Sequence, residues 1–360
     1  MIYNSLNTMA HPFKAFDDMT VVSSRHPDPE ALTLCAVARN EMYFLPAFLE
    51  HYRKLGIQQF AILNDRSRDG TKEYLLSQPD VVLLQSNYRY GDEVDLPTDI
   101  ADTMTAQRIL YIWRTILFNR FAKDRWAVQV DLDEFIHLPL GKTFEDIAAT
   151  LNYEGTNLAY GVMLDVYPET ISDLSHMAGQ REIDPAAKWY FDAEPHLKLR
   201  AGKSPKTLHP GARARLYHTF GVKRPHKKKK PLTLPSSILS KWLKGIHSIS
   251  AIPRYNNICK PVTAKWPDGA YFTSSHNASI AGSIKILLPI QHYRFTGALY
   301  SRINTAVREE SYSNGSRDYR LMSELLQQMQ VCGNGDFLYK NSRALKGFDD
   351  LRDAAVSIGL

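Results

Sequence analysis

The chain has 360 residues, of which 44% are hydrophobic and 23% charged, and its formal net charge is +6. This composition is typical of a globular, soluble protein, and the length allows one large α/β domain or two modest ones. No apolar stretch of about 18 residues and no signal-peptide pattern occurs, so we expect a cytoplasmic protein. Cys35, Cys259 and Cys332 are odd in number and widely spaced, which excludes a disulfide framework and a zinc site.

Short apolar runs alternate with helix-like segments over the first part of the chain. The runs at 32–38, 57–63 and 81–84 have the length of strands. Residues 39–56 carry apolar side chains at helical spacing, and a second helix starts at 71. Such an alternation predicts a parallel sheet with right-handed crossovers.

A second set of elements follows. We expect helices at 107–123 and 143–151, and strands at 126–138 and 157–168. The tail from Leu299 onward is predicted to be mostly helical. The predicted organisation is an N-terminal extension, a main α/β domain and a helical C-terminal region, at 1–30, 31–298 and 299–360.

The segment 195–267 is strongly basic, with 17 Lys and Arg residues and no Asp or Glu. It is rich in proline and glycine and has weak periodicity, so we expect a basic, irregular insert on the acceptor side of the domain. The run KRPHKKKK, 223–230, is either a solvated loop or a site that attracts phosphates of a substrate or of an anionic membrane surface. Nucleic acid is the least expected partner, because the run lacks interleaved aromatic residues.

The apolar run in WAVQVDLDEFIHL, 126–138, ends in Asp131, Asp133 and Glu134. A strand interior excludes unpaired charge because desolvating a carboxylate is costly, so these acids belong where the strand leaves the sheet. On an extended backbone Asp131 and Asp133 point the same way. The pair predicts a site for Mg²⁺ or Mn²⁺, which prefer oxygen ligands and are commonly shared with substrate phosphates.

Polar clusters also follow the first two predicted strands. Ligands of open parallel sheets bind beyond the carboxyl ends of the strands, so we expect these clusters to converge with the acids of 131–134. The residues of the two clusters are Arg39, Asn40 and Glu41, and Asn64, Asp65 and Asp69.

Three motifs, AVARNE (36–41), NDRSRDGT (64–71) and VDLDEF (130–135), carry a family resemblance. In order and approximate spacing they resemble glycosyltransferase family 2-like proteins, especially a bacterial branch. The resemblance covers about 31–170 well. It implies a GT-A fold, which is a Rossmann-like, mostly parallel sheet flanked by helices. It also implies a nucleotide-diphosphate sugar donor and a divalent metal, Mn²⁺ or Mg²⁺.

The resemblance also implies roles for single residues. Asp65 resembles the aspartate that hydrogen-bonds the nucleotide base, and Arg39 and Glu41 would line the same nucleotide pocket. Asp131 looks like the residue that faces the ribose beside the metal, and Asp133 looks like the direct metal ligand. Asn64 stands where the family usually has the first of two aspartates, which leaves one hydrogen-bonding role open.

Further candidates come from later in the chain. His276 and His292 could complete the metal shell, and the His-Tyr pair at 292 resembles a late motif of this branch, although a single histidine is more often structural. The inverting mechanism that the resemblance suggests needs a base for the acceptor hydroxyl. Asp165, which ends a strand-like run, is the first candidate, and Asp192 and Glu194 are the alternatives. Each aspartate could equally cap a turn.

The sequence therefore predicts a hexosyltransferase-type enzyme that moves a sugar to a glycan or lipid-linked acceptor. A role in surface polysaccharide synthesis at the inner membrane face follows by analogy alone. One alternative is a sugar-phosphate nucleotidyltransferase, although the usual Gly-rich loop after the first strand is missing. Another is a non-catalytic carbohydrate-binding or scaffold protein. A lysine or arginine of the same chain on Asp133 would count against the metal.

Overall fold

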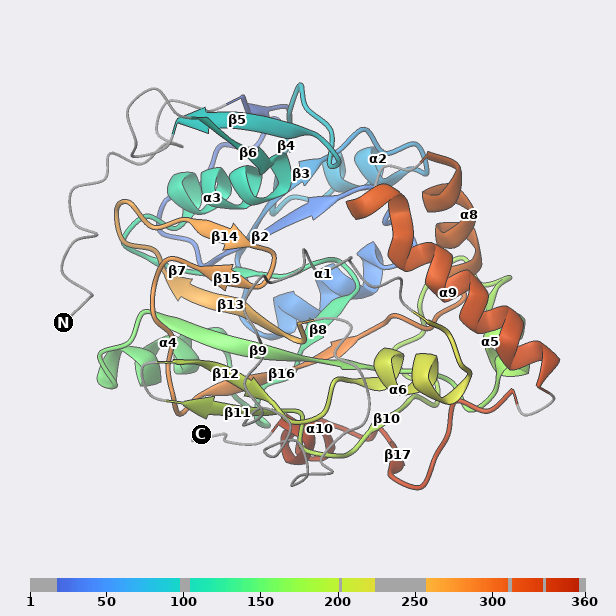
Figure 1. The fold of residues 1–360 in the computed structure, drawn as a ribbon. Helices are drawn as coiled ribbons and strands as arrows, with labels where there is room; N and C mark the ends of the chain where they lie inside the picture. Colours follow the sequence, from blue (N-terminus) through green and yellow to red (C-terminus); the bar gives the residue numbers. More distant parts are fainter. Residues whose placement is uncertain are drawn as a thin grey trace, which may run out of the picture.

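A nine-stranded mixed sheet forms the centre of the computed structural model, in the order β1-β4-β3-β2-β7-β13-β9-β16-β8 (Figure 1). The structure describes residues 18–97, 104–200, 203–223, 257–309, 313–332 and 335–355. Six of the nine strands run in one direction, and β1, β13 and β8 run against them. The chain is therefore an α/β protein with a large, mostly parallel central sheet.

The alternation predicted for the first part of the chain is confirmed. Its elements are β2 (Thr33–Ala38), α1 (Leu45–Lys54), β3 (Gln59–Asn64), α2 (Thr71–Leu76) and β4 (Val81–Gln85). The strands β2, β3 and β4 lie side by side and parallel. Successive side chains of β3 enter opposite cores, because side chains alternate across a strand: Phe60 and Ile62 pack in one and Ala61 and Leu63 in the other.

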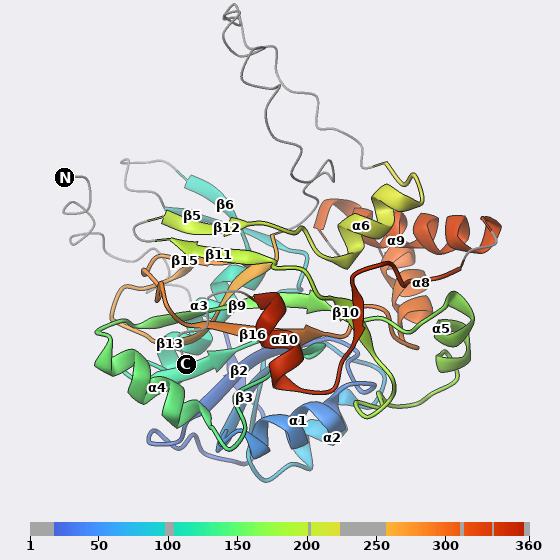
Figure 2. The same ribbon diagram turned by 90° about the horizontal axis from the view of Figure 1, so that it is seen from below.

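Helices cover both faces of the sheet. One core lies under α1, α2, α4 (Phe144–Tyr153) and α10 (Phe348–Ala355), and the other lies under α3 (Ile109–Phe121). Figure 2 shows α1 and α2 below the sheet and β11, β12 and α6 above it. A third core joins α5 (Ile171–Met177), α6 (Ala212–Thr219), α8 (Leu299–Glu309) and α9 (Ser313–Val331). None of the helices in the described ranges is both long and apolar enough to cross a bilayer.

The segment 126–138 differs from the single strand that we predicted. It forms β7 (Trp126–Gln129), a turn over Leu132 and Asp133, and β8 (Glu134–Ile136), which pairs with β16 (Leu287–His292) at the far edge of the sheet. Asp133 therefore lies in a turn and not in a continued strand, so the argument from strand alternation does not apply to the pair. The acids do leave the sheet at the end of β7, as burial of the preceding residues requires.

The expectation of an irregular insert at 195–267 is wrong for the parts that the structure describes. The strand β13 (Cys259–Lys265) lies inside the sheet, antiparallel to both β7 and β9 (Leu158–Asp165). The hairpin of β11 (Leu197–Arg200) and β12 (Lys203–Thr207) precedes α6. The strand β13 is buried on both faces, yet its sequence CKPVTAK includes two lysines, a proline and a threonine, so it forms no apolar run that would predict a strand. All but the first residue of the basic run 223–230 lies outside the described residues.

The remaining elements are short, and the tail is helical as predicted. Two-stranded sheets join β10 to β17, β5 to β6, and β14 to β15. Together with β1 their bounds are β1 (Thr20–Val21), β5 (Glu93–Pro97), β6 (Met104–Arg108), β10 (Tyr190–Asp192), β14 (Phe272–Ser274), β15 (Asn277–Ala278) and β17 (Ser342–Ala344).

Candidate functional site

A cavity of about 450 Å³ opens at the carboxyl ends of the parallel strands β2, β7, β9 and β16. Strand β2 is flanked by β3 on one side and β7 on the other, so the chain reverses its direction of winding there. Open α/β sheets bind ligands at such a switch point. Side chains from α8 and from the start of α9 complete the wall, which includes Arg302, Ser316, Asp318 and Tyr319.

The turn after β7 carries the first group of charges. Asp131 accepts hydrogen bonds from Arg114 at 2.5 Å and from Lys260 at 3.0 Å. The Lys260 ammonium also contacts Glu134 at 2.6 Å. Burial alone would raise the pKa of Asp131, but the cations of Arg114 and Lys260 outweigh burial and hold that pKa well below its usual range. Asp131 keeps 41% of its side chain exposed and lines the cavity, so this ion-paired carboxylate remains accessible.

Asp133 is held by a residue from the C-terminal region. Arg302 donates to Asp133 at 2.8 Å and also pairs with Glu41. Its guanidinium lies over the ring of Phe44, 4.7 Å from the centroid, which fixes its position. Burial raises the pKa of Glu41 to about 8, against the opposing effect of Arg302.

His292 connects Asp133 to Asp165. Its Nδ1 lies 2.6 Å from a carboxylate oxygen of Asp165, and its Nε2 lies 3.8 Å from Asp133. Arg213 donates to the other oxygen of Asp165 at 2.9 Å. Burial alone would lower the pKa of His292, but the two carboxylates raise it to about 9. His292 is therefore a cation at neutral pH, and both oxygens of Asp165, our first candidate for the base, are engaged.

His276 lines the cavity with a defined tautomer. Its Nδ1 lies 3.0 Å from the carbonyl oxygen of Cys259, which can only accept, so Nδ1 carries the proton. Burial lowers the pKa of His276 to about 4, so the ring is neutral at pH 7. Its Nε2 is therefore an acceptor, available to a ligand hydroxyl or to a metal ion.

The residues predicted to hold the nucleotide lie at or near the wall beyond the end of β2. Arg39 and Glu41 line the cavity, whereas Asp65 lies behind them. Asp65 accepts from Arg39 at 3.3 Å and from the backbone N–H of Tyr90 at 3.1 Å. Asp65 therefore positions Arg39 and the backbone of Tyr90 at the wall. Its predicted hydrogen bond to the nucleotide base stays a prediction.

The loop 64–71 has a clear structural role. Side chains of this loop accept three backbone N–H groups. Ser67 accepts that of Asn40 at 2.9 Å, Thr71 that of Glu41 at 2.9 Å, and Asp69 that of Met42 at 3.0 Å. These bonds fix the segment after β2. They also occupy the amides that a phosphate-binding loop would present to its ligand.

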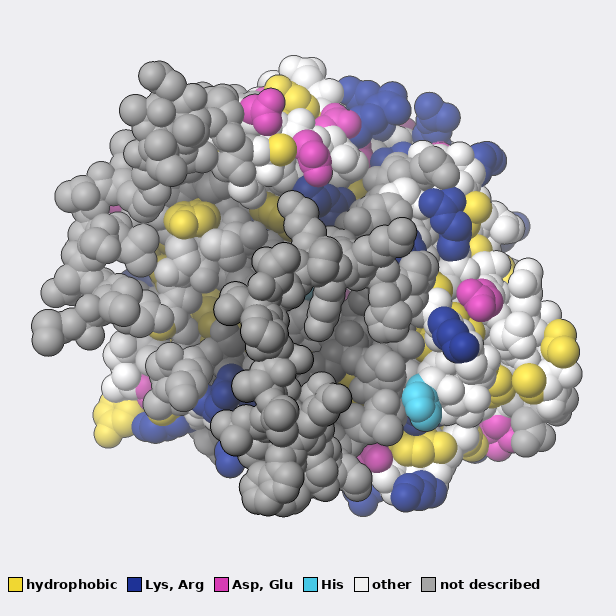
Figure 3. All heavy atoms as spheres, viewed as in Figure 1, with side chains coloured by type: hydrophobic (Ala, Val, Ile, Leu, Met, Phe, Trp, Pro, Cys, Tyr) yellow, Lys and Arg dark blue, Asp and Glu magenta, His cyan; other side chains and the backbone are white. Residues whose placement is uncertain are grey.

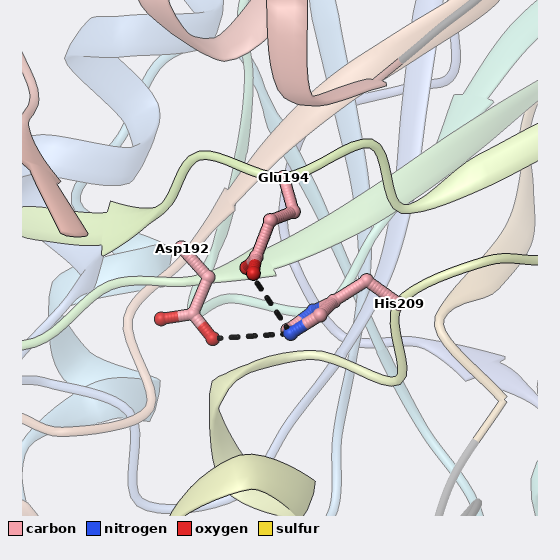
Figure 4. Close-up of side chains that lie close together, drawn as sticks. All are labelled: Asp192, Glu194 and His209. Carbon is pink, nitrogen blue, oxygen red and sulfur yellow. Dashed lines mark ion pairs between the residues drawn. The ribbon is translucent and has the colours of Figure 1, made fainter. Parts of the chain in front are cut away.

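Asp192 and Glu194, the other candidates for the base, do not line the cavity. Together with His209 they form a separate cluster in which one ligand atom from each lies within 4.8 Å of the others (Figure 4). Arg215 binds Asp192 through two hydrogen bonds of 2.9 and 2.8 Å, and Tyr167 donates to it at 2.6 Å. The cluster is therefore an internally satisfied network.

The same cluster does not fit a metal ion. His209 Nδ1 accepts the backbone N–H of Gly211 at 3.1 Å, so in the neutral ring Nε2 carries the proton. That Nε2 is the atom that faces Glu194, at 3.3 Å, and Asp192, at 3.7 Å. A protonated nitrogen cannot coordinate a metal, because coordination requires its lone pair.

Asp131 and Asp133 also fit a divalent ion poorly. Both oxygens of Asp131 and one oxygen of Asp133 accept from Arg114, Lys260 and Arg302. A metal that binds any of these three oxygens would have to displace a cation. The predicted metal roles of Asp131, Asp133, His276 and His292 stay predictions, and within the described residues the atoms of these four side chains that a metal could bind without displacing a cation are Nε2 of His276 and the second oxygen of Asp133.

No family model and no curated protein matches the chain. Among solved structures, a UDP-glucose pyrophosphorylase complexed with UDP-glucose is 7% identical, with a TM-score of 0.25; the match covers 48% of this chain and 65% of that one. A UDP-glucose pyrophosphorylase from Acinetobacter baumannii is 11% identical, with a TM-score of 0.24, over 49% of this chain and 63% of that one. The UTP-bound enzyme from that organism is 9% identical, with a TM-score of 0.25, over 85% and 84%.

The chain thus spans less than two thirds of the first two structures. At these TM-scores the likeness is too loose to identify a reaction. What the fold itself defines is an α/β protein with a charged cavity at the carboxyl ends of its parallel strands.

Sequence reasoning named Arg39 among the cations of the cavity and missed the other four. Arg213 and Lys260 come from the basic segment, whose side chains we expected to assist at a phosphate, but neither was singled out. Arg302 lies on a helix of the tail. Arg294 follows His292 by two residues, and that spacing was the one local signal available.

Proposed function

We propose that the chain is a transferase that binds a nucleotide-diphosphate sugar in this cavity and moves the sugar to an acceptor hydroxyl. The observation that supports the proposal most is the cavity itself, which lies at a strand switch point and is lined by Lys260, Arg213, Arg294, Arg302 and Arg39. Such a set of cations suits a diphosphate.

Basic side chains are also exposed on one side of the molecule. Figure 3 shows Lys and Arg side chains gathered over the α2 and α8 side of the molecule. Arg66, Arg68 and Arg308 are exposed.

Sugar transfer requires charge stabilisation and orientation that side chains of this wall can provide. The bond between the anomeric carbon and the diphosphate breaks, a bond to the acceptor oxygen forms, and the acceptor proton leaves to a base. Negative charge builds up on the departing diphosphate, where preorganised Lys and Arg side chains stabilise it. His276 Nε2, an acceptor at the wall, is placed to orient a sugar or acceptor hydroxyl.

A sugar-phosphate nucleotidyltransferase is the second candidate, because the same cavity would hold the same nucleotide sugar. The solved structures named above, with UDP-glucose or UTP bound, are a reason to include it in the test. Against it, residues 39–44 after β2 contain no glycine, and the amides of Asn40, Glu41 and Met42 are engaged by side chains. A phosphate-cradling loop needs free amides and close backbone approach.

One experiment separates these functions. The purified chain is incubated with a panel of nucleotide sugars, with and without pyrophosphate, and the products are identified by mass spectrometry. Release of a nucleoside diphosphate and free sugar supports sugar transfer, through slow hydrolysis. A nucleoside triphosphate formed only with pyrophosphate supports nucleotidyl transfer. Binding without either product would favour a carbohydrate-binding or scaffold protein and overturn the proposed activity.

A further inference from the structure

The carboxylates along the cavity do not outnumber the cations, which include the charged ring of His292. Of the described residues that line it, five are Asp or Glu and five are Lys or Arg. They are Glu41, Asp131, Asp133, Glu134 and Asp318, and Arg39, Arg213, Lys260, Arg294 and Arg302. A site for a divalent cation usually carries an excess of carboxylates, because the ion brings two positive charges. This wall has no such excess.

The carboxylates of the wall are already engaged by the chain's own cations. Lys260 contacts both Asp131 and Glu134, and Arg302 contacts both Asp133 and Glu41. Both cations are themselves held in place, Lys260 by burial in β13 and Arg302 by the ring of Phe44. A metal ion bound to the paired oxygens would have to break these pairs, whereas an anion would not.

Arg294 is a cation of the wall that Asp133 and Tyr319 stabilise electrostatically, without a direct salt bridge among the described residues. Its Nε is sealed from solvent and has no hydrogen-bond acceptor. Its guanidinium lies over the ring of Tyr319 at 4.9 Å, and within the described part of the chain no carboxylate oxygen lies at ion-pair distance from it. A buried donor without an acceptor is unfavourable, and a buried charge is normally paired. Because Arg294 lines the cavity, an anion bound there would supply the direct partner that the described part of the chain does not.

The geometry points to a cavity that binds the diphosphate of its ligand on Arg294, with Arg302 and Lys260 beside it, and without a divalent metal. This inference rests on the proposed function for the identity of the anion. A guanidinium suits the role because its planar fork donates two parallel hydrogen bonds to phosphate oxygens. It differs from the metal-bridged diphosphate that the family resemblance implies.

Inorganic pyrophosphate is the probe for the test, because it carries the diphosphate and nothing else. Its binding is measured by isothermal titration calorimetry, once in excess EDTA and once with Mn²⁺ and no chelator. We expect dissociation constants that agree within about threefold. Arg294→Met should weaken binding at least tenfold in EDTA. The control Arg53→Met, which removes an arginine paired with Asp80 on the surface, should leave binding unchanged.

Binding that appears only with Mn²⁺ would overturn the inference, as would an unchanged affinity in a folded Arg294→Met variant. Should that variant fail to fold, Arg294→Lys keeps the charge and loses the fork, and it should still bind several-fold more weakly. A parallel titration with UDP and GDP keeps the two proposals apart. Metal-independent pyrophosphate binding without nucleotide binding would reject the nucleotide-sugar proposal and leave the anion site standing. Nucleotide binding that requires Mn²⁺ would support the nucleotide-sugar proposal and reject the metal-free anion site.

Discussion

Two groups of acids and histidines in this molecule look alike as lists of residues and differ in what surrounds them. Asp131 and Asp133 lie at a cavity, and Asp131 keeps 41% of its side chain exposed. Asp192 is 1% exposed and is bound by Arg215 and Tyr167. Closeness of possible ligand atoms is therefore a weak sign of a site. Access to a cavity, and a buried donor left without an acceptor at its wall, are the stronger signs.

The comparison makes a first prediction, on stability. Asp192→Ala should lower the free energy of unfolding by about 3–5 kcal/mol, because it leaves the guanidinium of Arg215 buried without its carboxylate. Denaturant unfolding followed by circular dichroism measures the change. The control is Glu169→Ala, which removes an exposed pair with Lys188 and should change stability by less than about 1 kcal/mol. Equal effects of the two variants would contradict the buried network.

Asp133→Asn should act on turnover and spare the fold. It removes the carboxylate that positions Arg302 and His292 at the cavity, so hydrolysis or transfer of the donor sugar should fall about 100-fold or more. The measurement is product release from the nucleotide sugar that the panel identifies. Asp80→Asn, in a surface pair, is the matched control. Retained turnover in Asp133→Asn would remove this residue from the site, whether it acts on a metal or on Arg302.

A third prediction concerns pH. His292 has a pKa near 6.5 when unfolded and about 9 when folded, so its contribution to stability is present below pH 6.5 and is lost as the pH rises through 9. Wild type should lose more stability between pH 6.5 and 9.5 than His292→Gln does, by at most about 3 kcal/mol. Glu41, whose pKa is raised to about 8, titrates with the same sign in both proteins and cancels in the difference. Parallel curves for the two proteins would show that His292 is not held as a cation.

The smallest effect is expected at the second cluster. Added Zn²⁺ or Mn²⁺ should shift the melting temperature of His209→Ala and of wild type equally, because His209 Nε2 carries a proton and cannot coordinate. Differential scanning fluorimetry across a metal series measures the shift. A shift that is present in wild type and lost in His209→Ala would make this cluster a metal site and would reverse the comparison between the two regions.

Much of the fold followed from local pattern. The alternation from 32 to 85 was readable because each run has the length and period of its element, and the acids of 131–134 marked the end of β7 because charge cannot stay inside a sheet. The turn between β7 and β8 was read as a continued strand, since both halves are apolar. The strand β13 was missed, because Lys260, Pro261 and Thr263 interrupt its apolar residues and it lies within a segment rich in proline and glycine.

The sequence alone determined which acids would stand at the carboxyl edge of the sheet, since strand length and burial are local properties. Only the tertiary structure decided what those acids contact. Lys260 reaches Asp131 across 129 residues, and Arg302 reaches Asp133 across 169. An ion pair between such distant residues leaves no periodic trace in either segment, because its partners meet only when β13 enters the sheet and α8 packs beside it. The balance of charge at the cavity, and with it the kind of ligand that the cavity suits, is for that reason a property of the assembled fold.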